Sequence, residues 1–227
     1  MKTQKLGFMS RLRNRKGFSL VEIAVVLVII GIIIGAVVKG QDLILNARAK
    51  QVTSQLNTWR NLSLAYLDRN GRLPGDVNKD GVIGSGTDDA AGSAAASEIS
   101  STMTYAPANP IQIGSFRFYI YFGSVAGTSG SRNVIVLCNN DTCSGTFTKD
   151  ETELLKAVDM GIDGIADAGL GQFRAATAIA GTPATKNNVT GATFTAPITN
   201  GATGTTAAWY QATPAYVAGV WAFDRPF

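Results

Sequence analysis

The sequence predicts an α+β protein in which one long N-terminal helix precedes a small antiparallel β-sheet domain with long loops. Three observations support this fold class. Residues 18–38 form a nearly unbroken apolar run, and residues 41–70 contain no Pro and repeat apolar side chains at helical spacing. The remainder, 73–227, is rich in Gly and Thr and contains short β-like segments, a composition typical of strands and surface loops.

The apolar run 18–38 predicts a membrane-spanning helix. At 1.5 Å per residue it covers about 30 Å, the thickness of a bilayer core. Glu22 interrupts the run. A carboxylate in hydrocarbon is costly and is rarely retained without a partner. We therefore expect Glu22 to have a specific partner.

The basic character of the chain lies in its first residues. The net charge is +4, but six of the 20 Lys and Arg residues fall within 1–17, which contains no acid. The rest of the chain therefore has 14 basic against 16 acidic side chains. A basic segment before an apolar run holds that end of a membrane helix in the cytoplasm. The charge thus indicates membrane orientation and does not indicate a nucleic-acid partner.

The helix is expected to continue through 39–72 as an amphipathic second half. Its expected buried positions follow helical spacing, and they are Ala49, Val52, Leu56, Trp59, Ser63 and Tyr66. Arg and Gln side chains occupy the opposite face. The Asn70-Gly71 pair, with Pro74 just beyond, predicts the C-terminal end of the helix.

The domain expected over 73–227 contains several local patterns. Three segments are expected to be strands, and they are 116–124, 132–140 and "GTFTKD" at 145–150. Two segments are expected to be helical, and they are "ASEISS" at 96–101 and a core at 151–158 with acidic side chains in its first turn. The Thr-rich tract 175–208 is expected to be an exposed loop or an edge hairpin. The aromatic side chains after it are expected to pack onto the domain.

The chain has no His and only two Cys. It therefore lacks the Ser–His and Cys–His nucleophile systems, and it has no phosphate-binding Gly loop or nucleophile elbow. We expect no enzymatic activity. Cys138 and Cys143 would form a disulfide in an exported chain, whereas a reduced pair remains the alternative. A zinc site is disfavoured because there are two thiols and no imidazole.

The segment "KGFSLVEIAVVLVIIG" resembles the class III signal of prepilins, the precursors of type IV pilins and type II secretion pseudopilins. Such signals have a basic leader that ends in Gly, then Phe, then an acidic residue five positions into an apolar helix. The corresponding residues here are Gly17, Phe18 and Glu22. The chain departs from many pilins in having no Pro between Phe18 and Arg72.

The resemblance implies a pilin-like fold and a structural role. A membrane prepilin peptidase would cut between Gly17 and Phe18, remove the leader 1–17, and methylate the new amine. The subunit would then polymerise, and its Phe18 amine would pair with Glu22 of a neighbouring subunit. The expected partners are copies of the chain, other pilin-like subunits, the peptidase, an inner-membrane assembly platform, and membrane lipid before assembly.

The resemblance also implies a location. The chain would cross the bacterial inner membrane once, with its N-terminus cytoplasmic before cleavage, and later form part of a periplasmic or cell-surface filament. The residues leave open whether that filament is a type IV pilus or a type II secretion pseudopilus.

The segment "DVNKDGVIG" matches the first half of a calcium-binding loop. Its candidate ligands are Asp76, Asn78, Asp80, the carbonyl of Val82, and Asp88 in place of the usual closing Glu. The alternative is a turn whose Asx side chains bond their own backbone. Calcium is thus a candidate ligand, and no cofactor is required. A second functional hypothesis is a membrane-anchored calcium-binding module that does not polymerise.

A second acidic set is spaced by four residues and comprises Asp159, Asp163 and Asp167. Its members are expected to cap a loop rather than to bind a second cation.

Overall fold

The computed structural model describes the chain in six stretches, which are 17–84, 95–127, 130–180, 193–195, 208–209 and 215–224. Two compact units are present, Met1–Leu43 and Ile44–Phe227. One helix, α1 (Leu20–Asn70), contributes to both units. The other described helices are α3 (Ala95–Thr102) and α4 (Lys149–Asp163). The strands are β1 (Ile111–Ile113), β2 (Phe116–Gly127), β3 (Gly130–Cys138), β4 (Phe173–Ala176), β5 (Ala178–Ala180), β6 (Thr193–Thr195) and β7 (Ala218–Ala222).

In the first unit, α1 is long and apolar enough to cross a membrane. Among the described residues, none of its most apolar window is buried inside the chain. The Val, Leu and Ile side chains in this window are therefore not buried by any other part of the described chain. Apolar surface on this scale requires lipid or another protein to cover it.

In the second unit, α1 buries one face against the sheet. The buried positions are those expected from the helical spacing, Ala49, Val52, Leu56, Trp59, Ser63 and Tyr66. Trp59 is fully buried and meets Phe122 of β2 edge-on, with ring centroids 6.0 Å apart. The Ser63 hydroxyl donates to the Trp59 carbonyl at 2.9 Å, so this polar group is satisfied inside the core.

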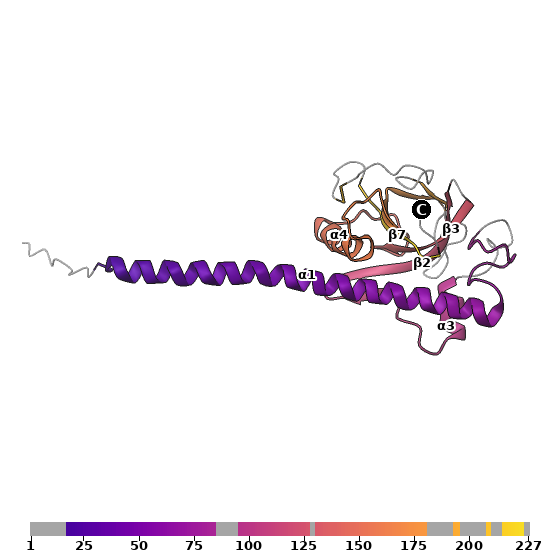
Figure 1. The fold of residues 1–227 in the computed structure, drawn as a ribbon, viewed down its shortest axis with the longest axis horizontal. Coiled ribbons are helices and arrows are strands. Elements are labelled where there is room, and N and C mark those ends of the chain that lie inside the picture. The colour runs from indigo at the N-terminus through magenta and orange to yellow at the C-terminus, as the bar shows by residue number, and fades with distance from the viewer. Residues whose placement is uncertain are drawn as a thin grey trace, which may run out of the picture. The chain divides into compact units, whose positions relative to one another are not determined.

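The strands form one sheet in the order β4-β7-β3-β2-β6-β5, with β1 paired to β2 outside that path. Figure 1 labels its strands β2, β3 and β7. The pairings are antiparallel except that of β2 with β6. The longest ladder joins β2 to β3, from Tyr119 opposite Cys138 to Gly127 opposite Gly130. The α+β fold expected from the sequence, a long helix packed on an antiparallel sheet, is confirmed.

Both faces of the central strands are buried. On β3, Ile135 and Leu137 point into the cluster shared with α1 and α4, whereas Val134 and Val136 point into a second cluster on the opposite face. This alternation follows from the two-residue period of a strand. The second cluster contains the Cys138–Cys143 pair.

The segment after α1 is fastened to α3. Gly71 has φ of 67°, and its N–H donates to the Leu67 carbonyl at 2.8 Å, so the helix ends in the left-handed cap expected from the sequence. The Arg72 guanidinium then forms two 3.0 Å hydrogen bonds with the Glu98 carboxylate of α3. The same carboxylate accepts the Gly75 N–H at 2.9 Å. A two-pronged Arg–carboxylate pair fixes orientation as well as distance.

The strand expected at 145–150 is wrong, because Thr148 starts α4 instead. The Thr148 hydroxyl accepts the Glu151 N–H, and the Glu151 carboxylate accepts the Thr148 N–H at 2.7 Å. This reciprocal capping box makes the segment a helix entrance. Helix α4 then covers the core with Leu154, Leu155 and Val158, as expected for 151–158. The helix expected at 96–101 is confirmed as α3.

The C-terminal aromatic side chains pack onto the domain as expected, and they are Trp209, Tyr216, Trp221 and Phe223. Within the Thr-rich tract 175–208, β5 and β6 pair as an antiparallel hairpin. Most of the rest of that tract lies outside the described residues.

Candidate functional site

The residues on either side of the expected cleavage point lie outside any helix or strand and are exposed. Gly17, Phe18 and Ser19 are not helical, and α1 begins at Leu20. Phe18 is 81% exposed, and no atom lies within 4 Å of the place where a Gly17 side chain would begin. Within the described part of the chain, the peptide bond between Gly17 and Phe18 is therefore unobstructed.

Ser19 and Glu22 form a capping box at the start of α1. The Glu22 N–H donates to Ser19 Oγ at 3.1 Å, and the Ser19 N–H donates to Glu22 Oε2, also at 3.1 Å. The Ser19 carbonyl accepts the Ile23 N–H at 3.3 Å, the first bond of the helix. Ser19 is therefore the N-cap residue and Glu22 is the third helical residue, the pairing typical of this motif.

The capping box gives Glu22 a partner that the apolar pattern alone did not reveal. One carboxylate oxygen accepts the Ser19 N–H, and the charge lies at the positive end of the helix dipole. Both effects lower the cost of a carboxylate at this position. Neither contact involves Glu22 Oε1.

The expected calcium loop forms a tight Asx-stabilised turn. Asp76 is 1% exposed, and its two carboxylate oxygens accept the N–H groups of Asp80 and Gly81 at 3.1 and 3.0 Å. Asn78 Oδ1 also accepts the Asp80 N–H at 3.0 Å, and Asp80 Oδ1 accepts the Val82 N–H at 2.8 Å. The side chains of the candidate ligands thus bond the backbone of their own loop.

These contacts match the turn that was the alternative to a calcium site. Among the described residues, no group of three or more His, Cys, Asp or Glu side chains is arranged to hold a metal ion. Asp88, the expected closing ligand, lies outside those residues. Calcium binding by Asp76, Asn78, Asp80, Val82 and Asp88 stays a prediction.

The two cysteines are joined. Cys138, the last residue of β3, forms a disulfide with Cys143, as predicted for an exported chain. The bridge closes a short loop of polar residues, and the Tyr121 hydroxyl donates to the Asp141 carbonyl within it at 2.8 Å. The disulfide thus fixes this loop to the β2–β3 ladder.

The second acidic set organises the loop that follows α4. Asp159 is completely buried, and its Oδ2 accepts the Asp167 N–H and the Trp209 Nε1–H, both at 2.7 Å. Asp163 Oδ2 accepts the Phe173 N–H at 2.8 Å, and Asp167 Oδ1 accepts the Gly169 N–H at 2.9 Å. Asp159 and Asp167 therefore cap loop backbone, as the sequence led us to expect, whereas Asp163 accepts the first N–H of strand β4.

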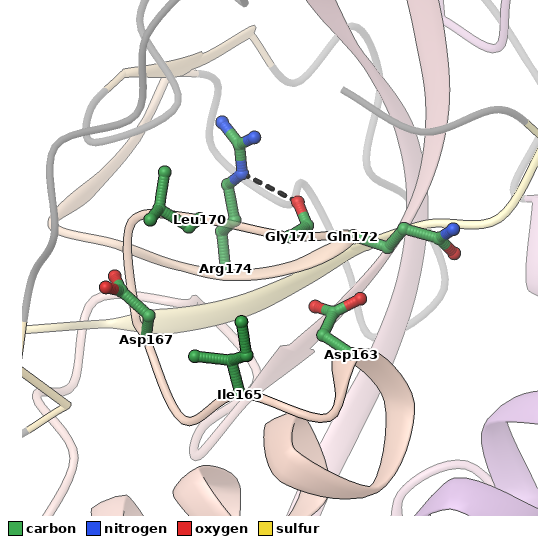
Figure 2. A pocket seen from close by; sticks show the side chains of 7 residues that line it. All are labelled: Asp163, Ile165, Asp167, Leu170, Gly171, Gln172 and Arg174. Atoms are coloured by element: carbon green, nitrogen blue, oxygen red, sulfur yellow. Dashed lines mark hydrogen bonds between the residues drawn. The ribbon is translucent and has the colours of Figure 1, made fainter.

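Burial raises the pKa of Asp159 to about 7, and the adjacent carboxyl of Asp163 acts in the same direction, whereas the donors on Trp209 and Asp167 oppose it. Figure 2 shows Asp163 and Asp167 on either side of Ile165, beside Arg174, whose Nε donates to the Gly171 carbonyl at 2.8 Å. These side chains line a hollow of about 320 Å³. The sequence spacing gave no indication of the role of Trp209, which lies 50 residues beyond Asp159.

The comparisons with known proteins concern the N-terminal segment. A family model described as the prokaryotic N-terminal methylation motif matches residues 12–38. No curated protein and no solved structure matches the chain. The matched stretch contains Gly17, Phe18, the Ser19–Glu22 box and the apolar part of α1. The matched motif supports a type IV pilin-like or prepilin-like protein.

The same motif supports processing by a prepilin peptidase. The apolar first half of α1 fits anchoring in the inner membrane. The motif covers a small part of the chain.

Proposed function

We propose that the mature chain begins at a methylated Phe18 and polymerises into a type IV pilus or pseudopilus filament. The observation that carries the proposal is an apolar half-helix that no described part of the chain covers, with one carboxylate, Glu22, near its start. Bilayer lipid covers this surface before assembly. Neighbouring copies of the same helix cover it in the filament.

The charge at the helix start supports this arrangement. Cleavage after Gly17 creates a positive amine on Phe18, which a filament core would bury. A buried charge that loses its partner costs about 3–5 kcal/mol. Ser19 holds one oxygen of Glu22, so the other can accept the amine of an incoming subunit. The pair then selects the register in which both charges are satisfied.

The membrane orientation and export of the chain are also part of the proposed function. The basic leader keeps the N-terminus cytoplasmic until cleavage, and the β-rich domain is exported. An inner-membrane assembly platform then adds the subunit to the filament. The chain acts as a structural subunit.

Mass spectrometry of the mature N-terminus tests the processing step. The expected product starts at Phe18 and carries one added methyl group, and bulky substitutions of Gly17 are expected to accumulate as precursor. A mature protein that still begins at Met1, in cells that contain a prepilin peptidase, would contradict the proposal.

Glu22 variants test the assembly step. Glu22→Leu removes the carboxylate, so membrane insertion should survive or improve while filament assembly fails. Glu22→Gln can still accept the Ser19 N–H, so it keeps the capping box and loses only the charge. We expect Glu22→Gln to assemble poorly, at a level between the wild type and Glu22→Leu.

The two variants separate the proposed ion pair from helix capping. If Glu22 served only the capping box, Glu22→Gln would form filaments as the wild type does. Normal filaments from Glu22→Leu would refute any role of the carboxylate in assembly. Filament yield by shearing and electron microscopy, normalised to mature protein in the membrane, measures both.

A further inference from the structure

We propose that Ser19 is a positioning residue for cleavage of the Gly17–Phe18 peptide bond, because it stops helix α1 short of that bond. The inference rests on the proposed processing at Gly17. It concerns the step before assembly and assigns the Ser19 hydroxyl a role separate from the Glu22 charge.

The hydrogen bonds at the helix start define the boundary. Ser19 Oγ accepts the Glu22 N–H at 3.1 Å, and the Ser19 carbonyl accepts the Ile23 N–H at 3.3 Å. With the cap at Ser19, the carbonyl of Gly17 lies two residues before the cap and outside the helix. Among the described residues, no hydrogen bond to that carbonyl is present.

The chemistry of cleavage requires this carbonyl to be free. Water attacks the Gly17 carbonyl carbon, the bond to the Phe18 nitrogen breaks, the leaving amine takes up a proton, and Gly17 keeps the carboxylate. A peptidase stabilises the transition state by donating hydrogen bonds to the carbonyl oxygen. A carbonyl that already accepts a helical N–H has lost part of its capacity to accept those donors.

Removing the cap would move the helix boundary towards the scissile bond. Ala is a poor N-cap residue, whereas Gly is an acceptable one. In Ser19→Ala, the next acceptable cap is Gly17, because Phe18 is not favoured there. An N-cap carbonyl accepts the first intrahelical bond. The Gly17 carbonyl would then accept the Val21 N–H, and the scissile bond would enter the first turn.

The test compares substitutions at position 19 in the full-length chain. The conversion of precursor to mature protein is followed by pulse–chase in cells that contain a prepilin peptidase. Ser19→Ala is expected to slow cleavage about fivefold, within a range of roughly two- to thirtyfold set by the preference for Ser over Ala at the N-cap. Ser19→Asn and Ser19→Thr keep the cap and should stay within about twofold of the wild type.

Ser19→Gly is the matched control for Ser19→Ala, because both variants lack the hydroxyl. If the helix boundary matters, Ser19→Gly remains within about twofold of the wild type while Ser19→Ala is slow. If the peptidase reads the hydroxyl itself, Ser19→Gly is as slow as Ser19→Ala, and the proposal is overturned. Wild-type cleavage of Ser19→Ala overturns it as well.

Glu22→Leu distinguishes this inference from the assembly proposal. Its backbone N–H still bonds Ser19 Oγ, so the boundary is kept and cleavage is expected within about twofold of the wild type. Filament assembly is the step expected to fail in that variant. Normal filaments from Glu22→Leu would refute the ion pair and would leave the inference about cleavage unaffected. A Glu22→Leu precursor that is cleaved as slowly as the Ser19→Ala precursor would refute the assignment of the helix boundary to the Ser19 hydroxyl.

Discussion

The stability of the β-rich unit should fall as the pH rises through neutrality, because burial of Asp159 favours the protonated form of its carboxyl. Its pKa is raised from 3.8 to about 7, chiefly by burial. A carboxyl whose pKa is raised by folding stabilises the folded state fully below its unfolded pKa. That contribution is lost as the pH rises through the folded pKa.

The expected size follows from these two pKa values. Between pH 5.5 and 8.5, a shift from 3.8 to about 7 changes the free energy of unfolding by about 2 kcal/mol. For a domain of this size, such a change lowers the melting temperature by roughly 4–8 °C. The chain has no His, the side chain that ordinarily titrates in this range.

Asp159 is surrounded by protein groups and not by solvent. Asp163 is on the same helix, and the Asp167 N–H of the following loop donates to Asp159 Oδ2. Burial lowers the pKa of Arg174, and burial raises that of Tyr216, with Asp167 adding to the latter. The ordinary pKa of the Tyr216 phenol, 10.0, is already above the tested range, and burial moves it further away.

Thermal unfolding of the full chain in detergent, followed by tryptophan fluorescence, measures the effect. Trp209 donates to Asp159 and is buried, so its emission reports on the same contact. Asp159→Asn keeps an oxygen for both donors and removes the titration, so its melting temperature should be nearly constant from pH 5.5 to 8.5. Glu153→Gln, a half-exposed site on the same helix, is the matched control and should retain the wild-type slope. A flat wild-type profile, or an unchanged slope in Asp159→Asn, would refute the reasoning.

Three further outcomes follow from the same unit. Replacing Cys138 and Cys143 by Ser should lower the free energy of unfolding by about 2 kcal/mol for a loop of this length. By mass spectrometry, the native peptide should be two hydrogens lighter before reduction than after it, and two free thiols would contradict the disulfide. Gly171→Ala should lower the free energy of unfolding by roughly 1–3 kcal/mol, because φ at this residue is +82° and the new methyl group would clash with the Asp163 carboxylate. An unchanged melting temperature would contradict this. Millimolar calcium should raise the melting temperature and Asp80→Ala should abolish the gain, whereas equal melts in calcium and chelator would leave the loop as a turn.

Local sequence patterns predicted the helices well, because a helix is formed by residues that are close together in the sequence. The face of α1 that packs on the sheet repeats every three or four residues, so the spacing alone assigns Val52, Leu56 and Trp59 to the core. The disulfide was also predictable because Cys138 and Cys143 are close in sequence. The strand expected at 145–150 failed for a local reason: the Thr148–Glu151 pair is a capping box, and its spacing was visible in the sequence.

Three strands were missed, two because they lack the alternation by which strands are detected and one because it is very short. Strand β7 is buried at all five positions and β4 at all four, so neither shows a polar face. Strand β1 has only three residues. A short segment buried on both faces cannot be told from other apolar segments by periodicity.

The tertiary contacts of the candidate sites were beyond the reach of sequence reasoning. The spacing of Asp159, Asp163 and Asp167 suggested loop caps, and the structure agrees for Asp159 and Asp167. The spacing could not show that Trp209, 50 residues away, donates a hydrogen bond to Asp159, nor that burial would raise the pKa of that carboxyl. Burial and long-range partners are set by the packing of the whole unit.

The glycines of the first half of α1 strengthen the case that other helices cover it. Gly31, Gly35 and Gly40 are helical, and nothing in the described chain lies within 4 Å of the place where a side chain would begin. Each costs up to about 1 kcal/mol relative to Ala in a helix. No contact within the described chain offsets that cost. Gly31 and Gly35 are four residues apart, the spacing that lets two apolar helices approach closely in a membrane or a filament core. Their cost is therefore offset only when a neighbouring helix packs there, as it would in a filament.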